Sequence, residues 1–307
     1  MRSPFDITME VKEPSFNSNA HSAENTSIDS RLLNYHELPS WYQENEFILS
    51  GYRQPSGSLV TCLRSWAYLH NESVNIFSHL LPAVAALCLI FAADFLLLHT
   101  YPKANATTRA LLMFYLMCVA VCFGLSAFYH TMINHSAKGH DIAIKLDYCG
   151  ILLLIYADFI TGEYVCFYCA PLLRDIYWSV ITVSTALTAF FFIHPRFQSK
   201  QYRTLRLSMF TFLGLSAFVP LIHGLLYFGA ANFASRSGFY YYLGEAGLLA
   251  VAAAVYALRW PESFVPERFD IFGASHQIFH VLTLTTVVIQ LLGLHSAYDK
   301  IYHDPRC

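Results

Sequence analysis

Long, continuous apolar stretches dominate the pattern of hydrophobic and polar positions along the chain. A helix needs about 20 apolar residues to cross the roughly 30 Å hydrocarbon layer of a bilayer. The runs are continuous rather than short and alternating, which disfavours a membrane β-barrel. The pattern therefore predicts an all-α membrane protein, a seven-transmembrane helix bundle. The expected spans are 76–98, 109–131, 144–165, 176–194, 206–229, 240–260 and 272–294.

The beginning of the chain has a different pattern. Residues 1–35 are polar and rich in Ser, Asn and acidic residues, which predicts a disordered N-terminal tail and no cleavable signal peptide. Residues 36–75 mix aromatic and charged residues, as is typical of short helices at a membrane surface. We interpret them as cytoplasmic juxtamembrane helices. The bundle then covers 76–294, and a short outer C-terminal tail covers 295–307.

Composition agrees with a chain that lies in lipid. Hydrophobic residues make up 55% and charged residues only 13%, whereas soluble domains carry about a quarter charged residues. A net charge of −2 offers no basic field for nucleic acid. Cys166 and Cys169 have the spacing of a redox or zinc pair, but no second pair completes a four-cysteine site. Packing or one local disulfide is the expected role of this pair.

The distribution of Lys and Arg predicts the orientation, because cytoplasmic loops carry the excess of basic residues. Seven spans place the two termini on opposite sides, and the bias places the N-terminus inside and the C-terminus outside, opposite to a G-protein-coupled receptor. Six basic residues flank the predicted outer ends: Lys103, Arg109, Arg174, Arg236, Lys300 and Arg306. Ten flank the inner ends: Arg53, Arg64, Lys138, Lys145, Arg196, Lys200, Arg203, Arg206, Arg259 and Arg268.

Ionisable residues inside a span usually mark function or a satisfied pair, and several fall at one level of this bundle. The second span ends at its inner side with His130, and the third begins there with Asp147. The seventh span also begins inside, with His276 and His280. We expect these inner ends to lie close together.

The spacing of the histidines favours a metal site. His276 and His280 are four residues apart, so they share one helix face, and with His130 they would give three nitrogen ligands. Three histidines with a fourth position for water describe a catalytic zinc site better than a closed structural one. The alternative is that the histidines hydrogen-bond between helices or lie at a wet interface. Asp147 could act on that water from a second layer, or pair with Lys145 or an arginine. Ser126 lies one turn from His130, and its hydroxyl alone more often serves helix packing.

Other intramembrane polar residues are less indicative of a site. Asp158 lies about 16 Å beyond Asp147 along a helix and cannot share the metal. We expect it to line a cavity or to form an inter-helix bond. Further polar residues fall in or beside spans, namely His79, Asp94, Glu163, His223 and Glu245.

These motifs together resemble the adiponectin and progestin receptor (PAQR) family, related to haemolysin III, over roughly residues 36–294. The likeness is greater to its adiponectin-receptor and fungal Izh-type branch, because no eighth span follows. Cys149 stands where a Ser is common, and Asp158 and Glu163 are unusually polar. The matching segments are Glu46-Phe-Ile, Gly51-Tyr-Arg53, His70-Asn-Glu-Ser-Val-Asn-Ile-Phe-Ser-His79, Ser126-x3-His130, Lys145-Leu-Asp147-Tyr-Cys-Gly-Ile, Pro266-Glu-Arg-Phe-Asp270 and Ser275-His-Gln-Ile-Phe-His280.

The resemblance implies a seven-helix fold with a cytoplasmic N-terminus. It also implies a Zn2+ ion held by His130, His276 and His280, with Asp147 and Ser126 around its water. Adiponectin receptors are credited with hydrolysing ceramide, and the fungal relatives are linked to zinc and lipid homeostasis.

We therefore hypothesise a zinc-dependent lipid amide hydrolase, ceramidase-like, in the plasma membrane or the endoplasmic reticulum. Its partners would be membrane lipids, such as ceramide, a fatty acid or a sterol-like ligand, and an extracellular protein ligand. The alternative is a non-enzymatic receptor or sensor in which zinc is structural. A channel would need a continuous polar pore, and the intramembrane acids are too few and scattered for one.

Overall fold

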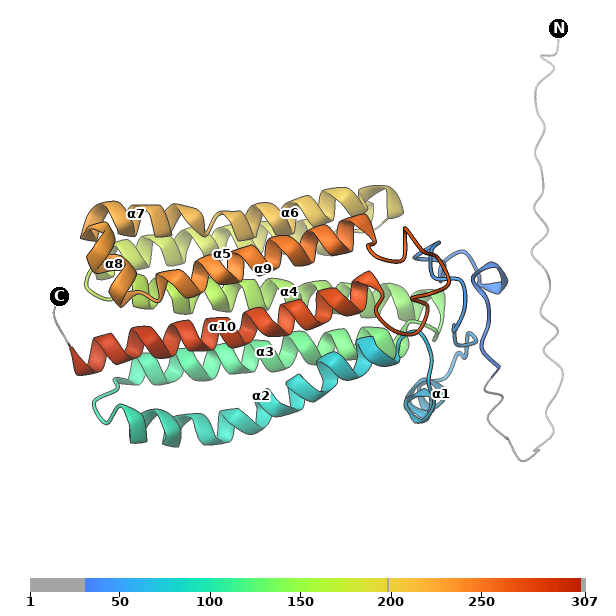
Figure 1. The fold of residues 1–307 in the computed structure, drawn as a ribbon, viewed down its shortest axis with the longest axis horizontal. Coiled ribbons are helices and arrows are strands. Elements are labelled where there is room, and N and C mark those ends of the chain that lie inside the picture. Colours follow the sequence, from blue (N-terminus) through green and yellow to red (C-terminus); the bar gives the residue numbers. More distant parts are fainter. Residues whose placement is uncertain (1–30, 198, 305–307) are drawn as a thin grey trace, which may run out of the picture. The chain divides into compact units, whose positions relative to one another are not determined.

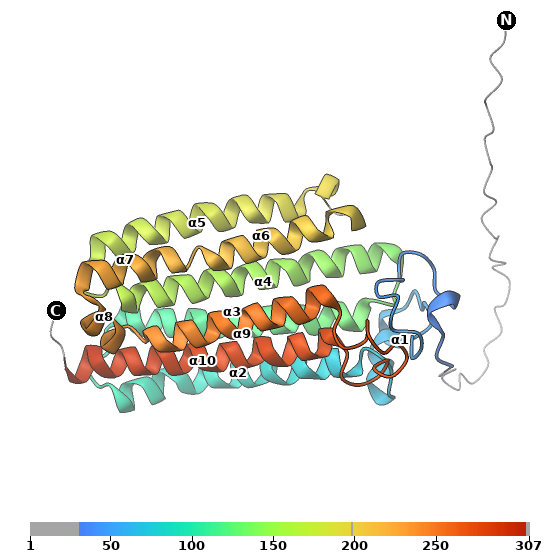
Figure 2. The ribbon, with the colours of Figure 1, turned by 45° about the horizontal axis from the view of Figure 1, so that its top comes forward.

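The apolar stretches form long helices that run side by side (Figures 1 and 2). The computed structural model describes residues 31–197 and 199–304, so most of the predicted 1–35 tail lies outside the described residues. The long helices are α2 (Ser73–Thr100), α3 (Ala106–Met132), α4 (Ala137–Cys166), α5 (Pro171–Ile193), α6 (Arg203–Leu215), α7 (Phe218–Phe228), α9 (Phe239–Leu258) and α10 (Ser275–His303). The short elements are η1 (Tyr35–Glu37), α1 (Leu59–Arg64), η2 (Ser65–Ala67), η3 (Pro195–Phe197), η4 (Lys200–Tyr202) and α8 (Ala230–Arg236).

Six of the spans are long and apolar enough to cross a bilayer: α2, α3, α5, α9, α10 and the segment Thr204–Phe228, which joins α6 to α7. α4 has 30 residues but carries Asp147, Asp158 and Glu163 along its length. It lies within the same bundle and makes the seventh span (Figure 1). The prediction of an all-α, multi-pass membrane protein is therefore confirmed.

Two helices differ from the expected spans. The predicted span 206–229 is interrupted between α6 and α7, where Pro220 has no N–H to offer the Ser216 carbonyl. That carbonyl accepts instead from the backbone N–H of Val219, at 3.1 Å. α10 continues to His303, beyond the expected end at 294.

The cysteine pair near the end of α4 does not form the local disulfide. Cys166 is a free, buried thiol, whereas Cys169 is disulfide-bonded. The two therefore do not pair with each other. Cys166 packs instead in a small apolar cluster with Phe167, Leu221 and Phe233, which matches the packing alternative.

The segment before α2 lies at one end of the bundle, next to the last turn of α3 and the loop before α10 (Figure 1). It is mostly irregular, with α1 and η2 as its helical parts after residue 37. Arg53 is 1% exposed and donates to the backbone carbonyls of His130 (2.6 Å) and Thr131 (3.2 Å). These carbonyls lack intrahelical partners at the end of α3, so Arg53 caps the helix that carries His130.

Candidate metal centre

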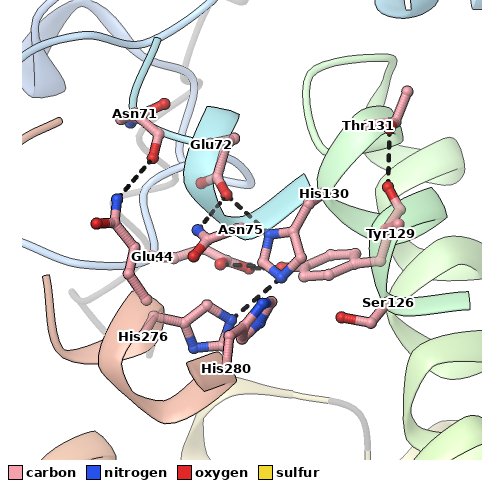
Figure 3. A network of polar contacts seen from close by, with 12 residues as sticks. Glu44, Asn71, Glu72, Asn75, Ser126, Tyr129, His130, Thr131, His276 and His280 are labelled. Atoms are coloured by element: carbon pink, nitrogen blue, oxygen red, sulfur yellow. Dashed lines mark hydrogen bonds and ion pairs between the residues drawn. The ribbon is translucent and has the colours of Figure 1, made fainter. Parts of the chain in front are cut away.

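Three histidines from two helices meet at this end of the bundle (Figure 3). His130 comes from the last turn of α3, and His276 and His280 come from the first two turns of α10. One nitrogen from each ring lies within 4.8 Å of the other two, so the group could hold a metal ion. His130 and His280 are each 2% exposed. The structure thus brings together the histidines that the sequence singled out, which we call the histidine cluster.

A carboxylate determines which nitrogen of His130 faces its neighbours. Nδ1 of His130 lies 2.8 Å from an oxygen of Glu72, at the start of α2, and Asn75 donates to the same oxygen at 2.7 Å. Burial alone would raise the pKa of Glu72, but the bonds from His130 and Asn75 outweigh it and lower the pKa to about 2. An ionised carboxylate only accepts, so Nδ1 carries a proton, and a neutral His130 then keeps its lone pair on Nε2.

His280 also has a partner on its outer nitrogen, Nδ1. The Ser78 hydroxyl donates its proton to the Asn75 carbonyl at 3.2 Å, so it must accept in its second contact, which is to Nδ1 of His280 at 3.1 Å. His280 therefore also keeps a lone pair on Nε2. Protein metal sites commonly hold histidine ligands in this way, with the outer nitrogen bonded to a carboxylate or another oxygen.

The separation of the nitrogens suits a shared ion. Nε2 of His276 and Nε2 of His130 are 3.2 Å apart. Two nitrogens bound to a tetrahedral ion at about 2.0–2.1 Å would be roughly 3.3 Å apart. The geometry and the nitrogen donor set therefore fit a borderline metal ion such as those that imidazole prefers.

The start of α10 is held in place by a buried acid. Glu262 is fully buried and accepts hydrogen bonds from the backbone N–H of Ser275 (2.7 Å) and from its hydroxyl. A negative charge at the first N–H groups of a helix is favourable. Asp270 accepts from Leu49 and Ser50 and so attaches the preceding loop to the N-terminal segment. These contacts explain why the loop before the seventh span is rich in acids.

The two candidate catalytic residues lie beside the cluster. Asp147 interacts by charge with His130 and contacts the Ser126 side chain. Lys145 pairs with Asp141 at 2.7 Å, so Asp147 is not its partner. Ser126 is 4% exposed, and its hydroxyl lies 2.8 Å from Nδ1 of His79.

Three neighbours of the cluster were not assigned to the site from the sequence, and all three lie on or beside the first turns of α2. Glu72 contacts His130, Ser78 contacts His280, and His79 stacks on His280 with ring centroids 3.7 Å apart. All three belong to the polar run at residues 70–79, which is the signal that could have found them. The other polar residues lie elsewhere: Asp94 pairs with Arg109, and His223 bonds Tyr177.

Comparison with known proteins gives a consistent set of relatives. The profile of a family described as haemolysin-III related matches residues 67–291. The chain is 35% identical to the ADIPOR-like receptor IZH1 of Eremothecium gossypii, over 87% of this chain and 85% of that protein. It is 34% identical to the adiponectin receptor protein of Drosophila melanogaster, over 89% of this chain but only 62% of that longer protein. It is 32% identical to the heptahelical transmembrane protein ADIPOR1 of Oryza sativa, over 83% and 81%.

Proposed function

This chain belongs to the haemolysin-III-related family, which includes adiponectin-receptor-like membrane proteins, and from that premise we propose that it is a zinc-dependent lipid amide hydrolase. His130, His276 and His280 would hold the ion, and the substrate would be a ceramide-like lipid. The observation that carries the proposal is the convergence of three imidazoles, two of them with the outer nitrogen already bonded to α2.

A bound zinc ion supplies a Lewis acid for the amide carbonyl and makes water nucleophilic near neutral pH. Asp147, beside His130 and Ser126, would accept the proton of the attacking water and later return it to the leaving amine. The Ser126 hydroxyl would donate to the substrate oxygen that gains charge. The ring of His79, which contacts this hydroxyl, would keep it in position. Glu72 and Ser78 would keep the ligand rings in position.

The arrangement of the spans supports a lipid substrate. The cluster lies at the end of an apolar bundle, so an acyl chain could extend along the interior while the amide stays near the histidines. The excess of basic residues at this end supports a cytoplasmic location for it. The disulfide at Cys169, near the opposite end of α4, supports an oxidising compartment there, such as the cell exterior or the lumen of the endoplasmic reticulum.

A second candidate is a receptor or sensor in which zinc is structural. The relatives' names favour it, because several are called receptors. In this case the ion would tie α3 to α10, and an outer protein ligand or a membrane lipid would shift the bundle. The same residues serve both functions, so an activity measurement has to separate them.

The test is hydrolysis of a short-chain fluorescent ceramide by purified protein in lipid nanodiscs, together with metal analysis. We expect one zinc per chain and product formation, both lost in His276→Ala. His295→Ala is the matched control, because it removes a histidine from the far part of α10 and should leave both unchanged. Stoichiometric zinc without zinc-dependent product would reject the hydrolase and favour the receptor; absence of zinc would reject both.

A further inference from the structure

A second polar cluster lies in the middle of the bundle, away from the histidines. Asp158 on α4 is three turns, or about 16 Å, from Asp147 on the same helix face. Tyr115 on α3, Glu245 on α9 and Gln290 on α10 contribute the other members, and they are 0%, 9% and 1% exposed. We call these four residues the carboxyl cluster.

Contacts between four helices bring this cluster together. The amide nitrogen of Gln290 donates to the Asp158 carbonyl (3.3 Å) and to the Thr161 hydroxyl (3.2 Å), which joins α10 to α4. The Asp158 and Glu245 carboxyl groups lie close enough for their charges to interact. The Tyr115 hydroxyl is directed at the Asp158 carboxyl group and interacts by charge with both acids. No Lys, Arg or His side chain pairs with either acid among the residues that the structure describes.

The cluster contains more hydrogen-bonding capacity than it uses. Oδ1 of Asp158 and Oε1 of Gln290 are both buried, and neither has a hydrogen-bond partner. Gln290 is more than nine-tenths buried, and the contacts above direct its amide to Asp158. Native proteins leave few such atoms unpaired, so two at one place point to a bound species.

The chemistry of the free atoms identifies the class of that species. Both free atoms are oxygens, the two carboxyl groups can supply negative charge to a bound cation, and oxygen ligands are those that hard cations prefer. A monovalent ion is favoured over a divalent one, because the cost of taking an ion out of water rises with the square of its charge. We propose that the carboxyl cluster binds a monovalent cation of the sodium type. The ion would join α3, α4, α9 and α10 at mid-membrane.

The site is independent of the proposed hydrolase, since it shares no residue with the histidine cluster. The experiment measures binding of 22Na+ to the purified full chain, with choline as the replacement cation at constant ionic strength. We expect stoichiometric, saturable binding in the parent. Asp158→Asn and Glu245→Gln should each weaken it by more than about tenfold, because each removes a charge-assisted contact.

Glu163→Gln is the matched control. Glu163 is another buried acid on α4 with an unpaired oxygen, but it is not part of the cluster. Sodium binding that survives Glu163→Gln and is lost in both cluster variants supports the proposal. No sodium binding by the parent, equal binding by all four proteins, or binding of 45Ca2+ in its place would overturn it. A gel-filtration profile and a helical circular-dichroism spectrum equal to those of the parent show that each variant is folded, so loss of sodium binding cannot be attributed to misfolding.

Discussion

The histidine cluster and the carboxyl cluster are both buried polar groups in an apolar bundle, but they differ in how they are held. In the histidine cluster, Nδ1 of His130 and Nδ1 of His280 each have a partner on α2. In the carboxyl cluster, one oxygen of Asp158 and one of Gln290 have none. Each unpaired buried polar atom costs about 1–3 kcal/mol, so the second cluster is the less stable arrangement as it stands.

This difference determines how each cluster would respond to a ligand. The outer nitrogens of the first cluster are already bonded, which orients the rings and leaves Nε2 for the ion. An ion there gains from preorganisation. In the second cluster the free atoms come from two helices, α4 and α10, so an ion would have to complete the contact between them. Substitutions in one cluster at a time show whether the two clusters act independently.

The largest expected effect is that of removing the metal. A ligand present at about 1,000 times its Kd stabilises the native state by about 4.1 kcal/mol. For a chain of this size we therefore expect chelation to lower the Tm by about 8–16 °C, and added zinc to restore it. Intrinsic fluorescence during heating in detergent measures this shift.

His276→Ala should show no chelator shift, because it has no intact ligand set. Glu245→Gln, which alters only the carboxyl cluster, should show the full shift. If chelation lowered the Tm of the parent and of His276→Ala equally, the stabilising metal would bind outside the histidine cluster, and the prediction would be wrong.

Glu72→Gln should have the next largest effect. The amide cannot accept the Nδ1 proton of His130 as strongly as the carboxylate does, and loss of such a partner typically lowers metal affinity 10–100-fold. Competition with a chromophoric zinc chelator measures the Kd. Glu46→Gln removes an exposed carboxyl group that pairs with Arg259 at the same end of the bundle, and it should leave the Kd unchanged. Equal affinities for parent and Glu72→Gln would show that this contact does not orient His130.

Ser78→Ala should have the smallest effect. It removes one neutral hydrogen bond to His280, worth about 1 kcal/mol, so zinc affinity should fall about fivefold. The same competition assay applies, with Ser235→Ala as the control, because that exposed hydroxyl bonds only its own helix. A loss larger than that of Glu72→Gln would reverse the ranking and mean that the neutral partner matters more than the charged one.

The helices and the members of the histidine cluster followed from the sequence pattern, for a local physical reason. An apolar run of about 20 residues predicts a bilayer span without reference to any other part of the chain. His276 and His280 share a face because of helix periodicity alone. Their meeting with His130 followed from topology, because the end of the second span and the start of the seventh lie at the same side of the bundle.

The break between α6 and α7 and the role of Arg53 were harder to predict. A proline inside an apolar run is tolerated in many membrane helices, so Pro220 by itself did not indicate where the helix would be interrupted. Arg53 was counted as a positive charge at the inner side, whereas its guanidinium is buried against the end of α3. Capping by a residue 77 positions away cannot be inferred from local pattern.

Hydropathy and helical spacing along the chain are enough to assign the class of protein, the approximate spans and the three histidines, because both are properties of neighbouring residues. The groups that surround those histidines, and the second polar cluster, depend on how the helices pack. Glu72 approaches His130, and Asp158 approaches Glu245, across wide gaps in the chain. Such contacts depend on how the helices rotate against one another, and that rotation is set by packing over the whole bundle.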